Sequence, residues 1–484
     1  MTRDEFQVLY DQGPDAVFAV FEQLMAQIRA LTARVQELEA RLNKDSHNSS
    51  KPPSSDGLSK KPISLRKKSG KPSGGQPGHP GRTLQQVANP DTVLLHSSPT
   101  CQACGHSLES GQAREEERRQ VFDLPPLRLH VTEHRSLSKV CPVCQTCNRA
   151  SFPPTVTQPV QYGERIQALA VYLMQYQLLP FARTQQLLSD LFGCSLSEGT
   201  LASILQECHQ TLAPVEAAMK TERRVPRRIS EALTQAKVAH FDETGMRIEG
   251  KLHWLHSSST SLLTFYAPHP KRGRDALNEI GILPVFAGRS VHDAWASYFG
   301  YACAHALCNA HLLRELIGLY EQTQQSWTHQ MTVLLLWIKR AVDRHKAAGA
   351  TPLPPAKLAA YETCYQRLIA QGLAQNPPAA PTGKRGRTKQ TPARNLLERL
   401  CTHPSAVLAF AYDFRVPFDN NLAERDLRML KVRQKVSGCF RSEEGASQFC
   451  RIRGYISTLR KQGYDLMQAL QSVFARQPVY PLLA

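Results

Sequence analysis

Apolar residues near the N-terminus recur at alternating spacings of three and four. Between residues 15 and 43 the repeating positions are Phe21, Leu24, Ile28, Leu31, Val35, Leu38 and Leu42. This is the a/d repeat of a coiled coil, with polar residues at most other positions. The pattern predicts a leucine-zipper-like helix within residues 1–45. We expect the seam to pair with a second copy; docking on the chain's own core is the alternative.

The periodicity stops at residue 46, and residues 46–95 form a predicted linker. Within it, residues 57–82 hold seven Lys or Arg and neither Asp nor Glu. Pro, Gly and Ser prevent a packed core there. Such a basic arm is expected to lie on phosphate backbone, or to act as a solvated spacer.

A helical period returns over residues 160–232. Gly193 ends one predicted helix, and Ser197 is a suitable N-cap for the next. A helix, a glycine-containing turn and a second helix are the spacing of a helix-turn-helix, so we interpret this region as DNA-binding; two packed helices without a DNA contact are the alternative.

Short apolar and aromatic runs then predict strands at 237–241, 252–257, 262–267, 289–292 and 304–308. A helical stretch over 274–280 separates the third from the fourth, and another helix covers 310–319. This order predicts a mixed sheet covered by helices. We assign 233–320 and 401–462 to this α/β domain, 321–400 to a helical insertion, and 463–484 to a C-terminal helix and tail. The whole chain is expected to be a multidomain α+β protein.

The net charge and hydropathy of the chain indicate which kinds of partner it binds. The net charge of +18 and pI near 9.4 favour a polyanion such as DNA. No apolar run approaches the roughly 18 residues of a membrane span, and the first residues lack the apolar core of a signal peptide. We therefore expect a cytoplasmic protein without a membrane partner.

Two C-x-x-C pairs stand apart from the other cysteines, whose total of 13 is odd. They are Cys101 with Cys104, and Cys141 with Cys144. Each pair can give two thiolates to one tetrahedral Zn²⁺, so residues 96–155 are predicted to form a zinc ribbon with one structural ion. The alternating segment 127–134 is a predicted strand between the pairs. Two alternative ligands, Cys147 and His106, are kept open.

Three acids have the settings of a metal-dependent site. Asp242 and Asp293 come at the ends of predicted strands, and Glu424 lies early in a predicted helix. Alternation along the first strand places Glu243 on the face opposite Asp242. Carboxylates held close together repel one another unless a cation lies between them. Mg²⁺ (or Mn²⁺) prefers oxygen ligands, and two such ions can clamp the attacking and leaving oxygens of phosphoryl transfer.

The helix that carries Glu424 is basic. Its cations Arg425, Arg428, Lys431 and Lys435 are candidate phosphate contacts. Rival third ligands are Asp419, Asp426, Glu443 and Glu444. Cys308 and His311 have a metal-like C-x-x-H spacing, but we interpret them as a buried cysteine and a histidine at a helix start.

Several motifs occur in a familiar order. Besides the paired C-x-x-C they are NSSKPPSSD (48–56), GGQPGH (74–79), HFDETG (240–245), CNAHLLR (308–314), NNLAER (420–425) and SGCFRSEEGA (437–446). Over nearly its whole length the chain resembles transposases of the Insertion Sequence 66 family. The pattern also leads us to expect glycine after the second acid, where this chain has Ala294, and an Arg-Lys-Asn pattern where it has residues 432–436.

The resemblance implies a ribonuclease-H-like catalytic domain with an Asp-Asp-Glu triad, carried over to Asp242, Asp293 and Glu424. It also implies a leucine zipper, a zinc-binding domain and a helical insertion before the glutamate. His311 and Arg314 are expected near the active site, on DNA. Elements of this family usually also encode two small accessory proteins.

The expected function is therefore a DNA transposase. It would cleave phosphodiesters at the ends of an insertion sequence and transfer the freed strand into target DNA. Two alternatives are kept: a non-catalytic zinc and helix-turn-helix DNA-binding regulator, and a ribonuclease-H-like structure-specific nuclease.

Overall fold

The structure is a computed structural model. It describes residues 2–45, 47–49, 83–112, 114, 117–216, 229–349, 352–380 and 388–483. The predicted basic arm at 57–82 lies outside the described residues.

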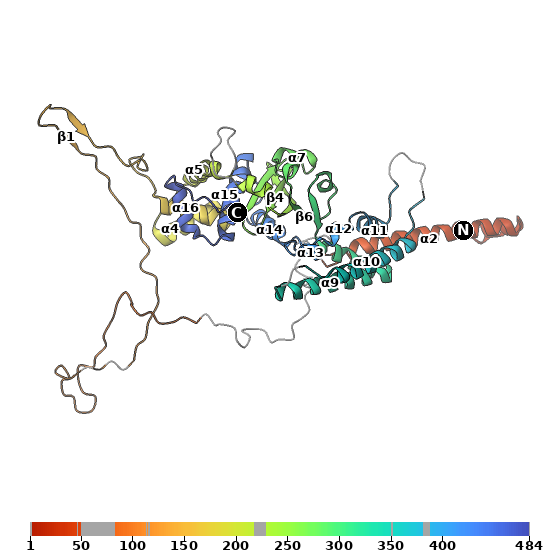
Figure 1. The fold of residues 1–484 in the computed structure, drawn as a ribbon, viewed down its shortest axis with the longest axis horizontal. Coiled ribbons are helices and arrows are strands. Elements are labelled where there is room, and N and C mark those ends of the chain that lie inside the picture. The colour runs from red at the N-terminus through yellow and green to blue at the C-terminus, as the bar shows by residue number, and fades with distance from the viewer. Residues whose placement is uncertain are drawn as a thin grey trace.

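A five-stranded mixed sheet lies at the centre of the molecule (Figure 1). Its strands are β3 (Val238–Ile248), β4 (Lys251–Ser259), β5 (Thr264–His269), β6 (Arg289–His292) and β7 (Ala304–Leu307). They lie in the order β5-β4-β3-β6-β7, with β3, β4 and β5 antiparallel and β3, β6 and β7 parallel. The predicted mixed sheet is confirmed, but the first strand is longer than the predicted 237–241. Its outer half pairs with β4 through a tight turn at Glu249 and Gly250, both with positive φ.

Helices cover both faces of this sheet because β3 is apolar on both sides. Met246 and Ile248 pack against α14 (Asn421–Ser437) and α15 (Glu443–Lys461). Ala239 and Phe241 point the opposite way, into a core formed with α6 (Ile229–Thr234) and α7 (Arg274–Ile280). Even-numbered positions of β3 therefore face α14, and odd-numbered positions face α7.

The residues predicted to form a helical insertion are largely helical. Its long helices are α9 (Ser326–Ala347), α10 (Pro355–Gln375) and α11 (Pro392–Thr402), and they share a core with α8 (Asn309–Thr323), β6 and β7. Two short helices, α12 (Pro404–Val407) and α13 (Ala409–Tyr412), lead back towards α14. The insertion thus rests on the parallel side of the sheet.

The helical region after residue 160 shares a core with the C-terminus. It contains α3 (Glu164–Val171), the π-helix Tyr172–Tyr176, α4 (Phe181–Phe192) and α5 (Glu198–Glu216), and these pack on α15 and α16 (Leu466–Phe474). Gly193 caps α4 in the left-handed conformation, and the Ser197 hydroxyl accepts a hydrogen bond from the Thr200 amide. The helix, turn and helix are present as predicted. However, α5 contains three Glu and no Lys or Arg, so it offers phosphate groups no cation.

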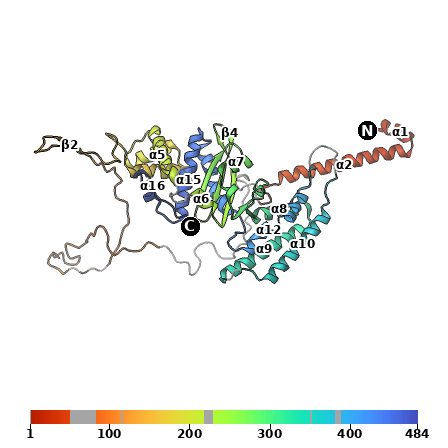
Figure 2. The same ribbon diagram turned by 45° about the horizontal axis from the view of Figure 1, so that its top comes forward.

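The N-terminal helices α1 (Arg3–Asp11) and α2 (Pro14–Leu42) project from the body of the molecule (Figure 2). The seven seam residues of α2, from Phe21 to Leu42, are between 44% and 81% exposed. The predicted helix is therefore confirmed, and its apolar stripe faces outwards.

The cysteine-rich region contains a two-stranded hairpin of β1 (Ser138–Val140) and β2 (Cys147–Arg149). The strand predicted at 127–134 was wrong: the structure gives these residues no regular element. Alternating side chains can form a strand only where another strand takes up the backbone hydrogen bonds. Across the described ranges, no helix is both long and apolar enough to cross a membrane.

Candidate functional site

The sheet register places the first two acids side by side. In the parallel pair, Val238 lies opposite Arg289 and His240 lies opposite Val291. Continuing this register by two residues brings Asp242 opposite Asp293. Neighbouring strands are about 4.8 Å apart, so the two residues lie side by side where the pairing ends. Asp242 lies in the middle of β3, not at its end as the sequence suggested; what ends there is the pairing with β6.

The chain turns sharply after β6. The Asp293 carboxylate accepts a hydrogen bond from the Trp295 amide at 2.9 Å, and Ala294 between them has φ of 73°. Non-glycine residues rarely adopt this left-handed conformation. The geometry therefore explains why the family pattern would place glycine at this position.

Asn420 fixes the start of α14, and with it Glu424. Its side-chain oxygen lies 2.7 Å from His240 Nδ1, and its amide nitrogen donates to the Phe241 carbonyl at 3.0 Å. Its backbone N–H donates to the sulfur of Cys308 at 3.2 Å. Asn420 is only 1% exposed, so one buried residue fastens α14 both to β3 and to the start of α8. The sequence analysis did not identify this role.

The three acids influence one another's charge. The pKa of Asp242 is raised well above its usual range, first by burial and then by the negative charges of Glu243, Asp293 and Glu424. The pKa of Glu424 is also raised, mainly by burial, with Asp293 adding to the effect. This cluster of oxygen donors suits a hard divalent cation, because a cation would remove the repulsion.

The carboxylates of Asp242, Asp293 and Glu424 are not all as close together as the ligands of a single metal ion. Among the described residues, the three ligand atoms that lie within 4.8 Å of one another belong to Cys308, His311 and Glu424. Asp242 and Asp293 are outside that group. A pair of ions roughly 3.5–4 Å apart requires such a wider arrangement of carboxylates.

Glu243 is fixed on the opposite face of the sheet, as its position in the strand predicts. Its carboxylate accepts hydrogen bonds from Arg272, at 2.8 Å from Nε, and from the Tyr298 hydroxyl. The Arg272 guanidinium lies between the rings of Trp254 and Trp295, at 4.8 and 4.4 Å from their centres. These contacts hold Glu243 away from the α14 face and leave Asp242 as the acid that faces Glu424.

The rival third ligands are engaged elsewhere or exposed. Asp426 pairs with Lys461 at 2.8 Å, and Asp419 accepts from the Asn421 amide at 3.1 Å. The Glu443 side chain is 79% exposed, and Glu444 is exposed beside it.

The candidate DNA contacts fall into two groups. His311 and Arg314 on α8 are mostly buried, and each lies 3.8 Å from a Glu424 oxygen. Burial, helped by the Arg314 charge, lowers the pKa of His311 to about 4, which keeps its ring neutral at neutral pH.

The second group lies on α14. Arg425, Arg428 and Lys435 are exposed there. Lys431 instead donates to the Gly245 carbonyl at 2.6 Å, so its nitrogen is used within the protein.

Each C-x-x-C pair forms the same tight turn. In the first turn, the Cys101 amide donates to the His106 carbonyl and the Gly105 amide donates to the Cys101 carbonyl. In the second turn, the Cys141 amide donates to the Thr146 carbonyl and the Gln145 amide donates to the Cys141 carbonyl. Gly105 and Gln145 occupy equivalent positions with positive φ. Hydrogen bonding to Thr146, together with Cys141, lowers the pKa of Cys144 to about 7, and the Cys104 and Ala103 amides lower that of Cys101. Each turn therefore contains one cysteine whose pKa is shifted towards the thiolate, the form that Zn²⁺ binds, although the four sulfurs are not gathered into one cluster.

Three family models match the chain. One described as the transposase IS66 family matches residues 159–448. A zinc-finger binding domain of transposase IS66 matches residues 98–145, which contain all four paired cysteines. A family of unknown function matches residues 3–85. No curated protein matches the chain.

Proposed function

The chain belongs to the IS66 transposase family, and from this premise we propose that it is a metal-dependent DNA transposase with Asp242, Asp293 and Glu424 as its catalytic acids. The observation that carries the proposal is the parallel register of β3 and β6. It brings two acids 51 positions apart to adjacent strand positions, and Asn420 then fastens the third beside them.

The catalytic domain in this proposal is ribonuclease-H-like. Support comes from the mixed sheet, the position of the acids at the end of β3–β6 pairing, and the helical insertion before α14. The three carboxylates would hold Mg²⁺, which when bound supplies charge stabilisation for the attacking and leaving oxygens of the phosphodiester.

The chain's own residues perform the other tasks. The buried Asn420 contacts hold the start of α14, which carries Glu424, against β3. The bonds to Arg272 and Tyr298 keep Glu243 from competing for the same space. Arg425, Arg428 and Lys435 present positive charge on the exposed side of α14, where the phosphate backbone would lie. Neutral His311 and buried Arg314 border Glu424 and would line the strand that is cut.

A zinc-binding module precedes this domain, and we propose that its four paired cysteines hold one structural Zn²⁺. We also propose that the chain self-associates through the exposed seam of α2, so that two element ends can be held together. DNA is the expected partner of the zinc module and of the catalytic domain, whereas the seam of α2 would bind a second copy of the chain.

A strand-transfer assay tests the activity. DNA ends taken from the sequence flanking the reading frame would be supplied pre-cut, with target DNA and Mg²⁺. A transposase joins the 3′-OH to the target. Hydrolysis without joining would replace the proposal with a structure-specific nuclease, and specific binding without either reaction would replace it with a DNA-binding regulator.

A further inference from the structure

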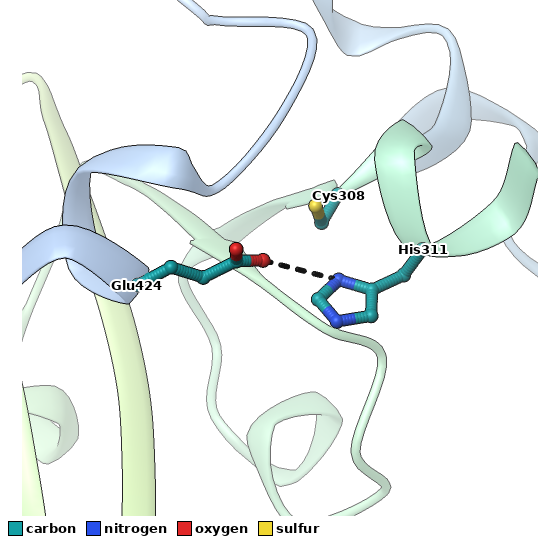
Figure 3. Close-up of side chains that lie close together, drawn as sticks. All are labelled: Cys308, His311 and Glu424. Carbon is teal, nitrogen blue, oxygen red and sulfur yellow. Dashed lines mark ion pairs between the residues drawn. The ribbon is translucent and has the colours of Figure 1, made fainter. Parts of the chain in front are cut away.

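Cys308, His311 and Glu424 converge on one point between two helix starts. Cys308 immediately precedes α8, His311 lies in the first turn of α8, and Glu424 lies in the first turn of α14. Their sulfur, nitrogen and oxygen atoms all lie within 4.8 Å of one another. Figure 3 shows the Glu424 carboxylate extending towards the His311 ring, with the Cys308 sulfur beside the gap between them.

Two of these donors lack hydrogen bonds. His311 Nδ1 and Glu424 Oε1 are buried atoms without a hydrogen-bond partner in the described part of the chain. They face each other at 3.8 Å, which is too long for a hydrogen bond. Burying unsatisfied polar atoms costs about 1–3 kcal/mol each. Two ligands of one tetrahedral Zn²⁺, bound at about 2.0–2.2 Å, lie roughly 3.4 Å apart, so one ion between them would satisfy both.

The Cys308 sulfur is also placed to bind a cation. Cys308 is 1% exposed, and its sulfur accepts the Asn420 backbone N–H at 3.2 Å. A donor of this kind favours the thiolate. Burial nevertheless raises the pKa of Cys308 to about 12, so the thiolate requires a cation beside it at neutral pH.

The local charges decide which kind of cation fits. Arg314 Nη2 lies 3.8 Å from the same Glu424 oxygen and opposes any cation there. Glu424 alone only balances that guanidinium, so a divalent ion gains net attraction only when Cys308 is also ionised. Mg²⁺ prefers oxygen ligands, whereas Zn²⁺ binds sulfur, imidazole nitrogen and carboxylate oxygen together.

We propose that Cys308, His311 and Glu424 form a binding site for a thiophilic divalent cation of the Zn²⁺ class, which shares Glu424 with the all-oxygen site that Asp242 and Asp293 complete. Three protein ligands leave a fourth position open. The ion would join the start of α8 to the start of α14. The proposal goes beyond the transposase function and stands whether or not Glu424 takes part in cleavage, because it is tested without DNA.

The test counts metal on the full-length protein. Purified chains would be stripped of metal, reloaded with Zn²⁺ in the presence of excess Mg²⁺, and analysed for zinc per chain. Wild type is expected to hold two ions, one in the four-cysteine module and one at this site. The Cys308→Ser and His311→Gln variants should each hold one, while Cys401→Ser, a matched variant of an exposed cysteine outside the group, should hold two.

Cobalt gives an independent readout. Reloading with Co²⁺ should produce a sulfur-to-metal absorption that is weaker in Cys308→Ser than in Cys401→Ser, with the four-cysteine contribution unchanged. One zinc in the wild type, or equal zinc in the wild type and both site variants, would overturn the proposal. If Cys308→Ser fails to fold, the His311→Gln count decides.

Discussion

Asp242 is the acid whose pKa is raised by burial and by all the other acids of the site. Its carboxyl is buried and faces the charges of Glu243, Asp293 and Glu424, which together raise its pKa. The folded, metal-free protein therefore holds the Asp242 proton more tightly than the unfolded chain does. Its contribution to stability falls as pH rises from the usual carboxyl range through the raised folded value.

Removing that charge should stabilise the metal-free protein. In EDTA near pH 8, Asp242→Asn should raise the melting temperature of the catalytic domain by about 2–4 °C, the equivalent of about 1 kcal/mol. The gain should shrink towards pH 5 as the wild-type carboxyl takes up its proton, and thermal unfolding of both proteins across that range measures it. Glu443→Gln, on an exposed acid, is the control and should change little. A variant less stable than wild type at pH 8 would contradict this view of the site.

Ala294 offers a second test at this scale. At φ of 73°, an L-residue is disfavoured by about 1 kcal/mol relative to glycine. Ala294→Gly should therefore leave the melting temperature unchanged or raise it by up to a few degrees. The matched change Ala296→Gly, at a neighbouring position without positive φ, should lower it, since glycine adds only unfolded-state entropy there. Equal losses in both variants would show that the turn after Asp293 is unstrained.

The sequence nominated the candidate acids, and strand alternation correctly separated Asp242 from Glu243. The C-x-x-H spacing was visible at Cys308 and His311, but the sequence favoured a buried cysteine and a helix-start histidine, and their approach to Glu424 appears only in the structure. The role of Asn420 could not be predicted, because it depends on contacts with Phe241 and Cys308, more than a hundred positions away.

At the scale of elements, the sequence predicted the bounds of a helix or strand best where that element has its own start and stop residues. The helix α7 has the predicted bounds because Gly273 precedes it and Gly281 ends it in the left-handed conformation. The length of β3 was underestimated because Glu243 and Thr244 interrupt its apolar run, and only pairing with β4 reveals the continuation. The strand predicted at 127–134 failed for the converse reason, because it has no partner strand.

The zinc module is an element whose stability should depend on metal. Cys141→Ser or Cys144→Ser should remove one Zn²⁺ per chain and make residues 83–160 more sensitive to proteolysis, since structural zinc supplies much of the stability of such modules. Metal analysis and limited proteolysis measure the two effects. Cys147→Ser tests the alternative ligand and should retain zinc. Zinc loss in Cys147→Ser with retention in Cys144→Ser would reassign the ligand set.

In the whole molecule, the exposed seam of α2 and the catalytic body perform separable tasks. Asn48, just beyond the helix, donates to Glu321 on α8 at 2.9 Å, so the chain is tied to the body immediately after α2. A truncation that ends before this contact removes the seam and leaves the body intact.

Deleting residues 1–45 should lower the oligomeric state and the yield of paired-end complexes while sparing most single-end binding. Light scattering and gel-shift assays measure these quantities. The matched control is a full-length chain with Leu31 and Leu38 changed to Glu, which charges the seam without shortening the chain and should behave like the deletion. An unchanged oligomer in both proteins would mean that α2 is not the self-association surface.

We propose that Asp242, Asp293 and Glu424 act together as one metal-dependent site of DNA cleavage. The most direct measurement is the rate of cleavage at an element end in Mg²⁺ for Asp242→Asn, Asp293→Asn and Glu424→Gln, with Asp419→Asn as the matched control on a nearby acid. Each triad variant should lose cleavage by at least about a thousandfold. Binding to the same DNA should stay close to wild type, and the control should cut normally. A triad variant that cuts at the wild-type rate would contradict this proposal.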